Sequence, residues 1–271
     1  MRVVDLHIHT IFSDGTLLPR EVVRLAALRG LSAIAITDHD EVGGLKEGVE
    51  FGERFGINVV QGIELSAKKE DKSIHLLGYF IDPNNRELLD FVHFMRESRL
   101  KRAEKIIDKL GEHGISIKMD DVQKHTGLGS IGRPHIAEAL VAERAVRDLQ
   151  EAFSKYLGDG KPCYVSKANV TPKSAIELIL SAGGIPILAH PAFLEPKDWI
   201  PEFVDEGLMG IEVWYPSHSE TQINKYLEIA NKYKLVPTGG SDSHGTRHGY
   251  PEIGEFTVPY QVLERLEASR G

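Results

Sequence analysis

Residues 5–15 read DLHIHTIFSDG, and the rest of the chain is best interpreted outward from this stretch. It overlaps an apolar run at residues 2–6 that predicts a short buried strand, and residues 19–29 have the apolar spacing of an amphipathic helix. The stretch therefore leads from a strand into a loop before a helix. Because side chains alternate along an extended chain, His7 and His9 would point to one face and could bind one metal ion. Alone, a His-x-His pair is weak evidence for a metal site, because surface or capping roles explain such pairs more often.

The composition is that of an ordinary globular protein. The chain has 271 residues, 41% hydrophobic and 27% charged, which suffices for one large domain or one domain with a small insert. No apolar run approaches about 18 residues and the first strand follows Met1, so we expect a cytoplasmic protein without a membrane span or targeting peptide. The single cysteine, Cys163, excludes an internal disulfide. The net charge of −8 disfavours binding of long DNA but leaves room for a local basic pocket.

Short apolar runs alternate with amphipathic helices through most of the chain. Strands are expected at residues 2–6, 32–36, 57–63, 73–80, 185–189, 209–213 and 235–238. Helices are expected at residues 19–29, 43–55, 172–182, 199–206, 220–233 and 261–268. This alternation predicts an α/β fold with a parallel sheet and helices outside it. In such folds the active site forms where the strands end and the following loops begin.

Residues 84–167 interrupt the alternation. A long amphipathic helix is expected at residues 84–110, with shorter helices near 133–142 and 146–157. We expect residues 99–167 to form an inserted helical lobe that binds substrate, between the two parts of the barrel at 1–98 and 168–271. This lobe holds 13 Lys/Arg and 10 Asp/Glu, so its charge of about +3 contrasts with about −11 for the remainder.

Histidines and carboxylates gather near the ends of the predicted strands. The set comprises His7, His9, Asp14, His39, Glu64, His75, His190, Asp242 and His244. A barrel would bring such residues together at one end, whereas chance would scatter them. Six imidazoles and three carboxylates exceed the needs of one ion, so we predict two or three divalent ions that share a bridging carboxylate. A donor set of nitrogen and oxygen suits manganese, zinc or iron.

These motifs resemble the polymerase and histidinol phosphatase family, the PHP domain. The matching stretches are DLHIH at 5–9, TDH at 37–39, Glu64, His75, AHP at 189–191 and GSDSH at 240–244. The resemblance implies a distorted (β/α)7 barrel with a trinuclear metal centre, in which manganese is the expected metal.

Carried over position by position, the resemblance implies three ligand groups. One ion would be held by His7, His9, Glu64 and Asp242. A second would be held by Asp14, His39 and His244, and a third by Glu64, His75 and His190. Glu64 would bridge two of the ions.

The predicted lobe resembles the 3′,5′-nucleoside bisphosphate phosphatase branch of that family, whose relatives include 5′-to-3′ exoribonucleases acting on short RNAs. The stretches that carry this resemblance are RLKRAE at 99–104 and GRPHIA at 132–137. It implies substrate contacts by Arg99, Arg102, Arg133 and His135. By itself, the pair of Arg99 and Arg102 fits a solvated helix face, whereas a helix start at Arg133 favours an anion.

The expected reaction is hydrolysis of the 3′-phosphate of nucleoside 3′,5′-bisphosphates, extending to short 5′-phosphorylated oligonucleotides. A metal-bound hydroxide would attack phosphorus, because bound ions lower the pKa of water toward ~7 and screen the phosphoryl charge. The residues that would hold this hydroxide in place are His7, His9, Asp14, His39, Glu64, Asp242 and His244. The leaving-group acid stays open among His218, His248 and a metal-bound water.

Two other functions fit the same motifs. One is a histidinol-phosphate-type phosphomonoesterase, and the other is a non-catalytic metal-binding PHP module. A nucleic-acid-binding regulator is disfavoured by the negative net charge.

Several residues around the predicted centre have two interpretations. Asp5 and Asp38 are candidates to orient ligand imidazoles, although Asp is common at loop starts. For Trp214 and Tyr215 core packing is the expected role, and stacking on a nucleobase is the alternative. Lys167 could approach a phosphate or lie in a solvated hinge.

Overall fold

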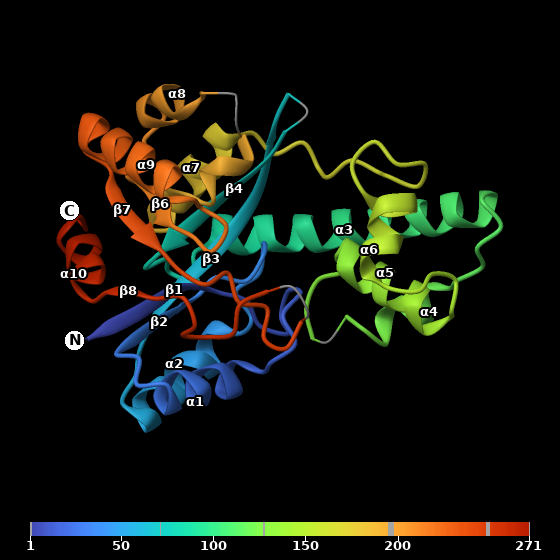
Figure 1. Ribbon diagram of the computed structural model, residues 1–271, viewed down its shortest axis with the longest axis horizontal. Coiled ribbons are helices and arrows are strands. Elements are labelled where there is room, and N and C mark those ends of the chain that lie inside the picture. Colours follow the sequence, from blue (N-terminus) through green and yellow to red (C-terminus); the bar gives the residue numbers. More distant parts are fainter. Residues whose placement is uncertain (1, 71, 127, 195–197, 248–249, 271) are drawn as a thin grey trace.

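The computed structural model describes residues 2–70, 72–126, 128–194, 198–247 and 250–270. Within them, eight strands form one sheet in the order β7-β6-β5-β4-β3-β2-β1-β8. The strands are β1 (Val3–Ile8), β2 (Ala33–Ile36), β3 (Asn58–Lys69), β4 (Lys72–Tyr79), β5 (Ile185–Leu188), β6 (Gly210–Trp214), β7 (Val236–Gly239) and β8 (Val258–Pro259). The predicted α/β class is confirmed, and the sheet curls into a nearly closed barrel (Figure 1).

The barrel closes where the segment after β7 meets β1. The backbone nitrogen of His9 donates to the carbonyl of Ser243 at 2.9 Å, and Ile8 pairs with Ser243 in parallel orientation. Glycine is required at position 240, because a Cβ there would collide with the backbone nitrogen of His7. Closure therefore places the motif at 5–9 beside the motif at 240–244.

The expectation of a parallel sheet is wrong for β4. This strand is antiparallel to both β3 and β5, and Lys69 of β3 pairs directly with Lys72 of β4. A connection this short can join only antiparallel strands, since a parallel pair needs a crossover of a dozen or more residues. Because β4 runs in the opposite direction, its first half lies at the barrel end where the parallel strands finish. His75 reaches the predicted site for this reason.

Three further details of the strands differ from the prediction. Strand β3 continues to Lys69, beyond the predicted end at residue 63, so Glu64 lies within the strand. Strand β1 continues to Ile8, so His7 lies within the strand and not in the loop. The short strand β8 was not predicted, because two residues carry no periodicity, and it pairs antiparallel with β1.

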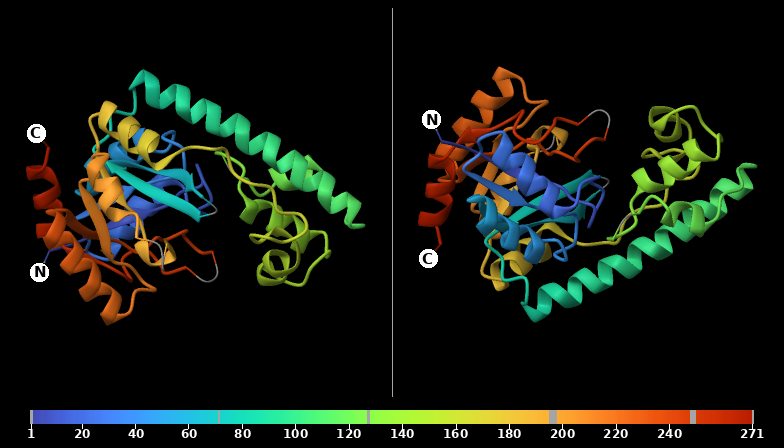
Figure 2. Two further views of the ribbon diagram at one scale, coloured as in Figure 1. Left: turned by 90° about the horizontal axis from the view of Figure 1, so that it is seen from above. Right: turned by 90° about the horizontal axis from the view of Figure 1, so that it is seen from below.

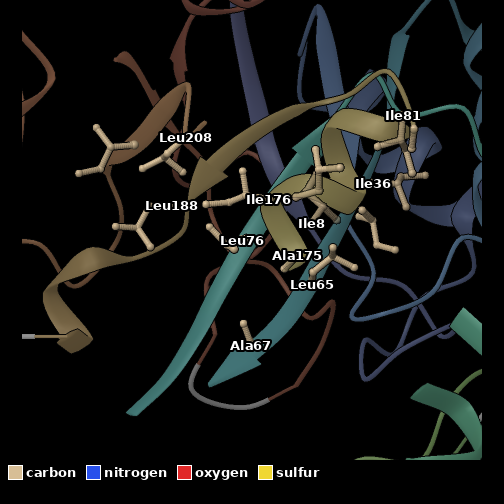
Figure 3. Close-up of a cluster of buried hydrophobic side chains, with 14 of the residues drawn as sticks. Ile8, Ile36, Leu65, Ala67, Leu76, Ile81, Ala175, Ile176, Leu188 and Leu208 are labelled. Carbon is tan, nitrogen blue, oxygen red and sulfur yellow. The ribbon is translucent and has the colours of Figure 1, made fainter. Parts of the chain in front are cut away.

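Six helices cover the outside of the barrel (Figure 1). They are α1 (Pro19–Leu28), α2 (Leu45–Phe55), α7 (Pro172–Ser181), α8 (Ile200–Asp205), α9 (Glu220–Tyr233) and α10 (Gln261–Ala268). Each bound lies within two residues of the prediction. Figure 3 shows part of the core between helices and sheet, where Ile176 of α7 faces Leu76 of β4 and Leu188 of β5. The helices thus bury their apolar faces against the strands that position the site.

The region at 99–167 is helical. Helix α3 (Arg86–Glu112) extends from the barrel, and α4 (Met119–Gln123), α5 (Arg133–Ala142), α6 (Leu149–Ala152) and the π-helix η1 (Phe153–Leu157) gather beside its second half (Figure 2). These elements share a separate hydrophobic cluster that includes Leu110, Leu140 and Cys163. We call residues 99–167 the helical lobe, although its first residue lies inside the continuous helix α3. The short helix α4 was not predicted, and the helix expected at 146–157 begins at Leu149.

The helical lobe contacts the loops that follow the parallel strands. The guanidinium of Arg247, after β7, lies 2.7 Å from the carboxylate of Glu138 on α5. The backbone nitrogen of Ser130 donates to the carbonyl of Phe12, after β1, at 3.3 Å. The lobe therefore lies at the barrel end where the predicted ligands are. Among the residues described, no helix is long and apolar enough to cross a membrane.

Candidate metal centre

Glu64, on β3, lies at the centre of the site. Its side chain is fully buried, and five imidazole nitrogens lie within 3.2 Å of its two oxygens. Oε2 faces His7, His9 and His39, at 3.2, 3.1 and 3.0 Å. Oε1 faces His75 and His190, at 2.8 and 3.1 Å. One carboxylate thus joins residues from β1, β4 and the segments after β1, β2 and β5.

Two aspartates extend this cluster. Oδ1 of Asp242 lies 3.3 Å from Nε2 of His7 and 3.0 Å from Nε2 of His9. Oδ1 of Asp14 lies 3.2 Å from Nε2 of His244. The structure therefore brings all nine sequence-predicted ligand residues into one place.

The donor atoms fall into three overlapping groups, each compact enough for an ion. The groups are His7, His9, Glu64 and Asp242; His9, Asp14, His39 and His244; and His39, Glu64 and His75. The first group is the one implied for the first ion. The second adds His9 to the implied set, and the third contains His39 where the resemblance implies His190.

The donor set fits divalent metal ions. Four buried donor atoms lie within 3.2 Å of a carboxylate or imidazole but make no hydrogen bond of acceptable geometry, namely Nε2 of His9, Oδ1 of Asp14, Nδ1 of His39 and Nδ1 of His75. Leaving a buried polar atom unpaired costs about 1–3 kcal/mol, so four in one cluster need another partner. The N···O separations of 2.8–3.3 Å suit ligands around ions with bonds of about 2.0–2.2 Å.

The ionisation states in this cluster favour cation binding. Burial alone would raise the pKa of Glu64, but the imidazoles of His39, His75 and His7 hold it well below its usual range. Burial, and next the charge of Lys167, lowers the pKa of His75 to about 3. Although burial acts in the opposite direction, Asp242 and Glu64 raise the pKa of His9 to about 10. Ionised carboxylates are the form that binds metals, whereas an imidazole must release its proton to do so. The raised pKa of His9 therefore reflects the negative charge of Asp242 and Glu64, which also attracts a divalent cation.

Sequence reasoning missed Glu212, a fully buried residue on β6. Its Oε1 lies 3.0 Å from Nδ1 of His7, and its Oε2 accepts a hydrogen bond from the backbone nitrogen of His190 at 2.7 Å. The one sequence feature that could have revealed Glu212 is its position as a single carboxylate within the apolar strand predicted at 209–213. Glu212 therefore fixes the ring of one candidate ligand and the backbone of another.

We expect the substitution Glu212→Gln to weaken Mn²⁺ binding about 10–100-fold, since partners of metal-binding histidines contribute that much to affinity. Calorimetric titration of the variant with Mn²⁺ measures the change. The matched control is Glu228→Gln at an exposed position of α9, which should bind as the unaltered protein does. Equal affinities for all three proteins would show that Glu212 does not support the centre.

Asp5 and Asp38, the candidates to orient ligand imidazoles, make hydrogen bonds to neighbouring backbone and hydroxyl groups. Asp5 accepts from the backbone nitrogens of Ser241 and Gly254 at 2.9 and 3.2 Å, and burial raises its pKa to about 6. Asp38 accepts from the hydroxyl of Ser13 at 2.6 Å, and that hydroxyl lies 3.5 Å from Nδ1 of His9. Their short side chains reach neighbouring loops first, so they position backbone and hydroxyl groups around the cluster.

Arg99 and Arg102 do not lie on a solvated face. Arg99 is paired with the buried carboxylate of Asp40 and donates to the hydroxyl of Ser66 at 3.2 Å. Nε of Arg102 donates to the carbonyl of Val165 at 2.7 Å, and one of its terminal nitrogens is buried without a partner. Both guanidinium groups are therefore held at the junction between barrel and lobe.

Helix α5 begins at Arg133, as predicted. The guanidinium of Arg133 donates to the carbonyl of Leu157 at 3.0 Å and to Asp159 at 2.7 Å. His135 is buried, and its Nδ1 accepts from the backbone nitrogen of Gly132 at 3.0 Å. Burial lowers the pKa of His135 to about 4, so its imidazole is neutral at neutral pH.

Lys167 contacts the metal-ligand cluster and lies near the three arginines described above. Its Nζ lies 3.0 Å from Nε2 of His75 and 3.1 Å from the hydroxyl of Ser73. Burial, with the charges of neighbouring arginines, lowers its pKa to about 8. The interpretation of Lys167 as a solvated hinge residue is therefore wrong. We call Arg99, Arg102, Arg133 and Lys167 the basic cluster.

A cavity of about 520 Å³ opens beside the candidate ligands. Its lining includes His39, Glu64, His75, His190, Asp242 and His244, together with Ser73, Asp159, Phe193, Tyr215 and Tyr250. A neighbouring hollow is lined by Arg133, Tyr164 and Lys167 and shares Ser73 and Asp159 with the cavity. The volume of the cavity suits a nucleotide-sized ligand. The neighbouring hollow measures only about 10 Å³, and it places Arg133 and Lys167 next to the ligand cluster.

The remaining candidates lie around the cavity wall. The hydroxyl of Tyr215 donates to Oδ2 of Asp242 at 2.9 Å, and Trp214 packs against the hydrophobic core. His218 is buried, with Nδ1 2.9 Å from the carbonyl of Val213. His248 lies outside the described residues, so the structure does not place it.

Comparison with known proteins places this site in a family. The PHP domain model matches residues 5–160. A 3′,5′-nucleoside bisphosphate phosphatase from Chromobacterium violaceum is 35% identical over 260 residues, covering 94% of this chain and 91% of the relative. A phosphoribosyl 1,2-cyclic phosphate 1,2-diphosphodiesterase from Eggerthella lenta is 34% identical over 267 residues, covering 95% and 99%. A 5′-3′ exoribonuclease from Haemophilus influenzae is 32% identical over 256 residues, covering 93% of each.

A solved structure is also similar to this chain over nearly its whole length. The crystal structure of a protein assigned as a metal-dependent phosphoesterase from Bifidobacterium adolescentis superposes with a TM-score of 0.91 at 31% identity. The superposed region covers 99% of this chain and 96% of the Bifidobacterium adolescentis chain. The similarity therefore extends over both the barrel and the helical lobe.

Proposed function

Because the chain belongs to the PHP domain family and is a metal-dependent phosphoesterase, we propose that it removes the 3′-phosphate from nucleoside 3′,5′-bisphosphates. Short 5′-phosphorylated oligonucleotides are its further substrates in this proposal, as the exoribonuclease relative suggests. The observation that carries the proposal is the position of Arg133 and Lys167 directly beside the cavity that the candidate metal ligands line. A substrate with two phosphates needs cationic groups for the second phosphate next to the metal centre that binds the first.

We assign the ligands to three ions as follows. One ion would be held by His7, His9, Glu64 and Asp242, a second by Asp14, His39 and His244, and a third by Glu64, His75 and His190. Manganese is the proposed metal, because imidazole and carboxylate donors without a thiolate suit it. Divalent ions in such a site lower the pKa of coordinated water toward ~7 and neutralise charge on the phosphoryl oxygens.

The protein's own groups then bind and orient the substrate. In this proposal, Arg102 and Arg133 bind the second phosphate, since a guanidinium donates two parallel hydrogen bonds to such an anion. Arg99 and Lys167 add positive charge next to it, because both lie where barrel and lobe meet. The neutral imidazole of His135 serves as a further donor at the start of α5. These contacts fix the bisphosphate with its other phosphate against the ligand cluster.

One competing function is favoured by a specific observation. The Eggerthella lenta relative is nearly as similar as the bisphosphate phosphatase, and the substrate in its name also carries two phosphate groups. A histidinol-phosphate-type activity would leave the basic cluster without a ligand, because that substrate has one phosphate. The complete ligand set also disfavours a non-catalytic metal-binding module.

The deciding experiment compares phosphate release from three substrates by the Mn²⁺-loaded protein. These are adenosine 3′,5′-bisphosphate, phosphoribosyl 1,2-cyclic phosphate and histidinol phosphate. We expect the highest kcat/KM for adenosine 3′,5′-bisphosphate. A higher value for either other substrate would overturn the proposal and identify the competing activity. The Glu64→Gln variant, purified in the same way, controls for contaminating phosphatases.

A further inference from the structure

Two aromatic side chains in the cavity have exposed faces. Phe193 is 56% exposed and Tyr250 is 39% exposed, and both line the cavity beside the candidate ligands. Exposed apolar side chains scattered singly over a surface need no explanation, but aromatic rings that gather in a concave polar site mark ligand recognition. Neither ring has a role in the phosphate contacts proposed above.

The ring of Phe193 is held by residues of the metal centre. Phe193 lies on the 3-10 helix η2 (Pro191–Leu194), and its backbone nitrogen donates to the carbonyl of His190 at 3.2 Å. Its ring centroid lies 5.0 Å from that of His190 and 5.9 Å from that of Tyr215, in an edge-to-face arrangement with Tyr215. Tyr215 is itself fixed by its hydrogen bond to Asp242. The contacts with His190 and Tyr215 therefore fix the orientation of the Phe193 ring, and more than half of the residue's surface remains exposed to solvent.

Tyr250 lies against another candidate ligand. Its ring centroid is 4.0 Å from that of His244, with an angle of 38° between the planes. The cavity thus contains aromatic surface beside His190 and beside His244.

We propose that Phe193, assisted by Tyr250, binds the nucleobase of the substrate by stacking and so selects nucleotides over sugar phosphates without a base. Every nucleobase has a π-face that an aromatic side chain can stack on, whereas a ribose phosphate has none. This inference rests on the proposed function, because it places the base beside the metal centre while the basic cluster takes the second phosphate. Trp214, the alternative from sequence, packs in the core and is not among the residues lining the cavity.

The test uses Phe193→Ala with Phe94→Ala as a matched control. Phe94 is 52% exposed on α3 and does not line this cavity. With Phe193→Ala we expect the KM for adenosine 3′,5′-bisphosphate to rise about tenfold, the scale of losing one stacked base, with kcat nearly unchanged. The KM for base-free ribose 3,5-bisphosphate should change less than about twofold, because that substrate has no ring to stack. Phe94→Ala should leave both values unchanged, and Phe193→Trp should restore the preference for the nucleotide.

A binding measurement separates this inference from the proposed activity. Equilibrium dialysis of the Mn²⁺-loaded protein compares adenosine 5′-monophosphate with ribose 5-phosphate, without requiring turnover. A weaker affinity of Phe193→Ala for the nucleotide alone supports stacking, even if the bisphosphate proves not to be the substrate. Equal losses for both ligands, or no loss for either, would overturn the role of Phe193. Absence of turnover by the unaltered protein would overturn the proposed function instead.

Discussion

Replacing Glu64 by glutamine is expected to reduce phosphoester hydrolysis at least about a thousandfold, because in the proposed centre its negative charge would bridge two ions and no other side chain could replace it. In the structure five imidazole nitrogens lie around its two oxygens, and each oxygen faces more than one of them. A neutral amide presents one oxygen and one NH₂ group, so it cannot serve as an anionic ligand on both sides. Loss of this one charge should therefore empty at least two of the ion positions.

Phosphate release and metal content of the purified Glu64→Gln variant measure this effect together. The control is Glu53→Gln at an exposed position of α2, which should retain both. Circular dichroism shows whether the barrel still forms. A folded Glu64→Gln protein that keeps its metal content and more than about a tenth of its activity would contradict the central position of Glu64.

Replacing Arg133 by methionine is expected to raise the KM for adenosine 3′,5′-bisphosphate about 10–100-fold, since a hydrogen bond to a charged group contributes about 1.5–3 kcal/mol. Methionine keeps much of the length of the side chain and removes the charge. A substrate with one phosphate, such as p-nitrophenyl phosphate, should be affected far less, because in the proposed binding mode its phosphate lies at the metal ligands. The measured quantity is therefore the rise in KM for adenosine 3′,5′-bisphosphate compared with the rise in KM for p-nitrophenyl phosphate.

Arg144→Met, at an exposed position of the same lobe, is the matched control and should leave both KM values unchanged. A thermal melt of each variant accounts for the loss of the contact between Arg133 and Asp159. An equal rise in KM for both substrates would mean that Arg133 supports the lobe and does not bind the second phosphate.

Much of the barrel could be predicted because periodicity is a local property of sequence. The bounds of α9 and α10 in the barrel, and of α5 in the helical lobe, agree with the prediction residue for residue. Ser219 before α9 and Pro134 in the first turn of α5 also mark where those two helices begin. The direction of β4 could not be predicted in this way. An antiparallel and a parallel strand have similar local patterns, and the short turn between β3 and β4 decides between them.

Most candidate ligands could be predicted because they lie in short sequence motifs at or just after strand ends, although Glu64 and His75 lie within β3 and β4. Glu212 was missed because its position in the middle of an apolar strand carries no motif, and its role depends on His7 and His190, which are distant in sequence. Phe193 was missed for a related reason. An aromatic residue two places after the AHP motif is unremarkable until the fold leaves its ring exposed in the cavity.

Anomalous X-ray diffraction from crystals of the protein grown with Mn²⁺ tests the multinuclear centre most directly. Two or three anomalous peaks are expected, each within about 2.5 Å of the donor atoms assigned to it, with Glu64 between two of them. A single peak, or peaks that lie away from Glu64, His190 and Asp242, would contradict the proposed centre and the phosphoester chemistry built on it.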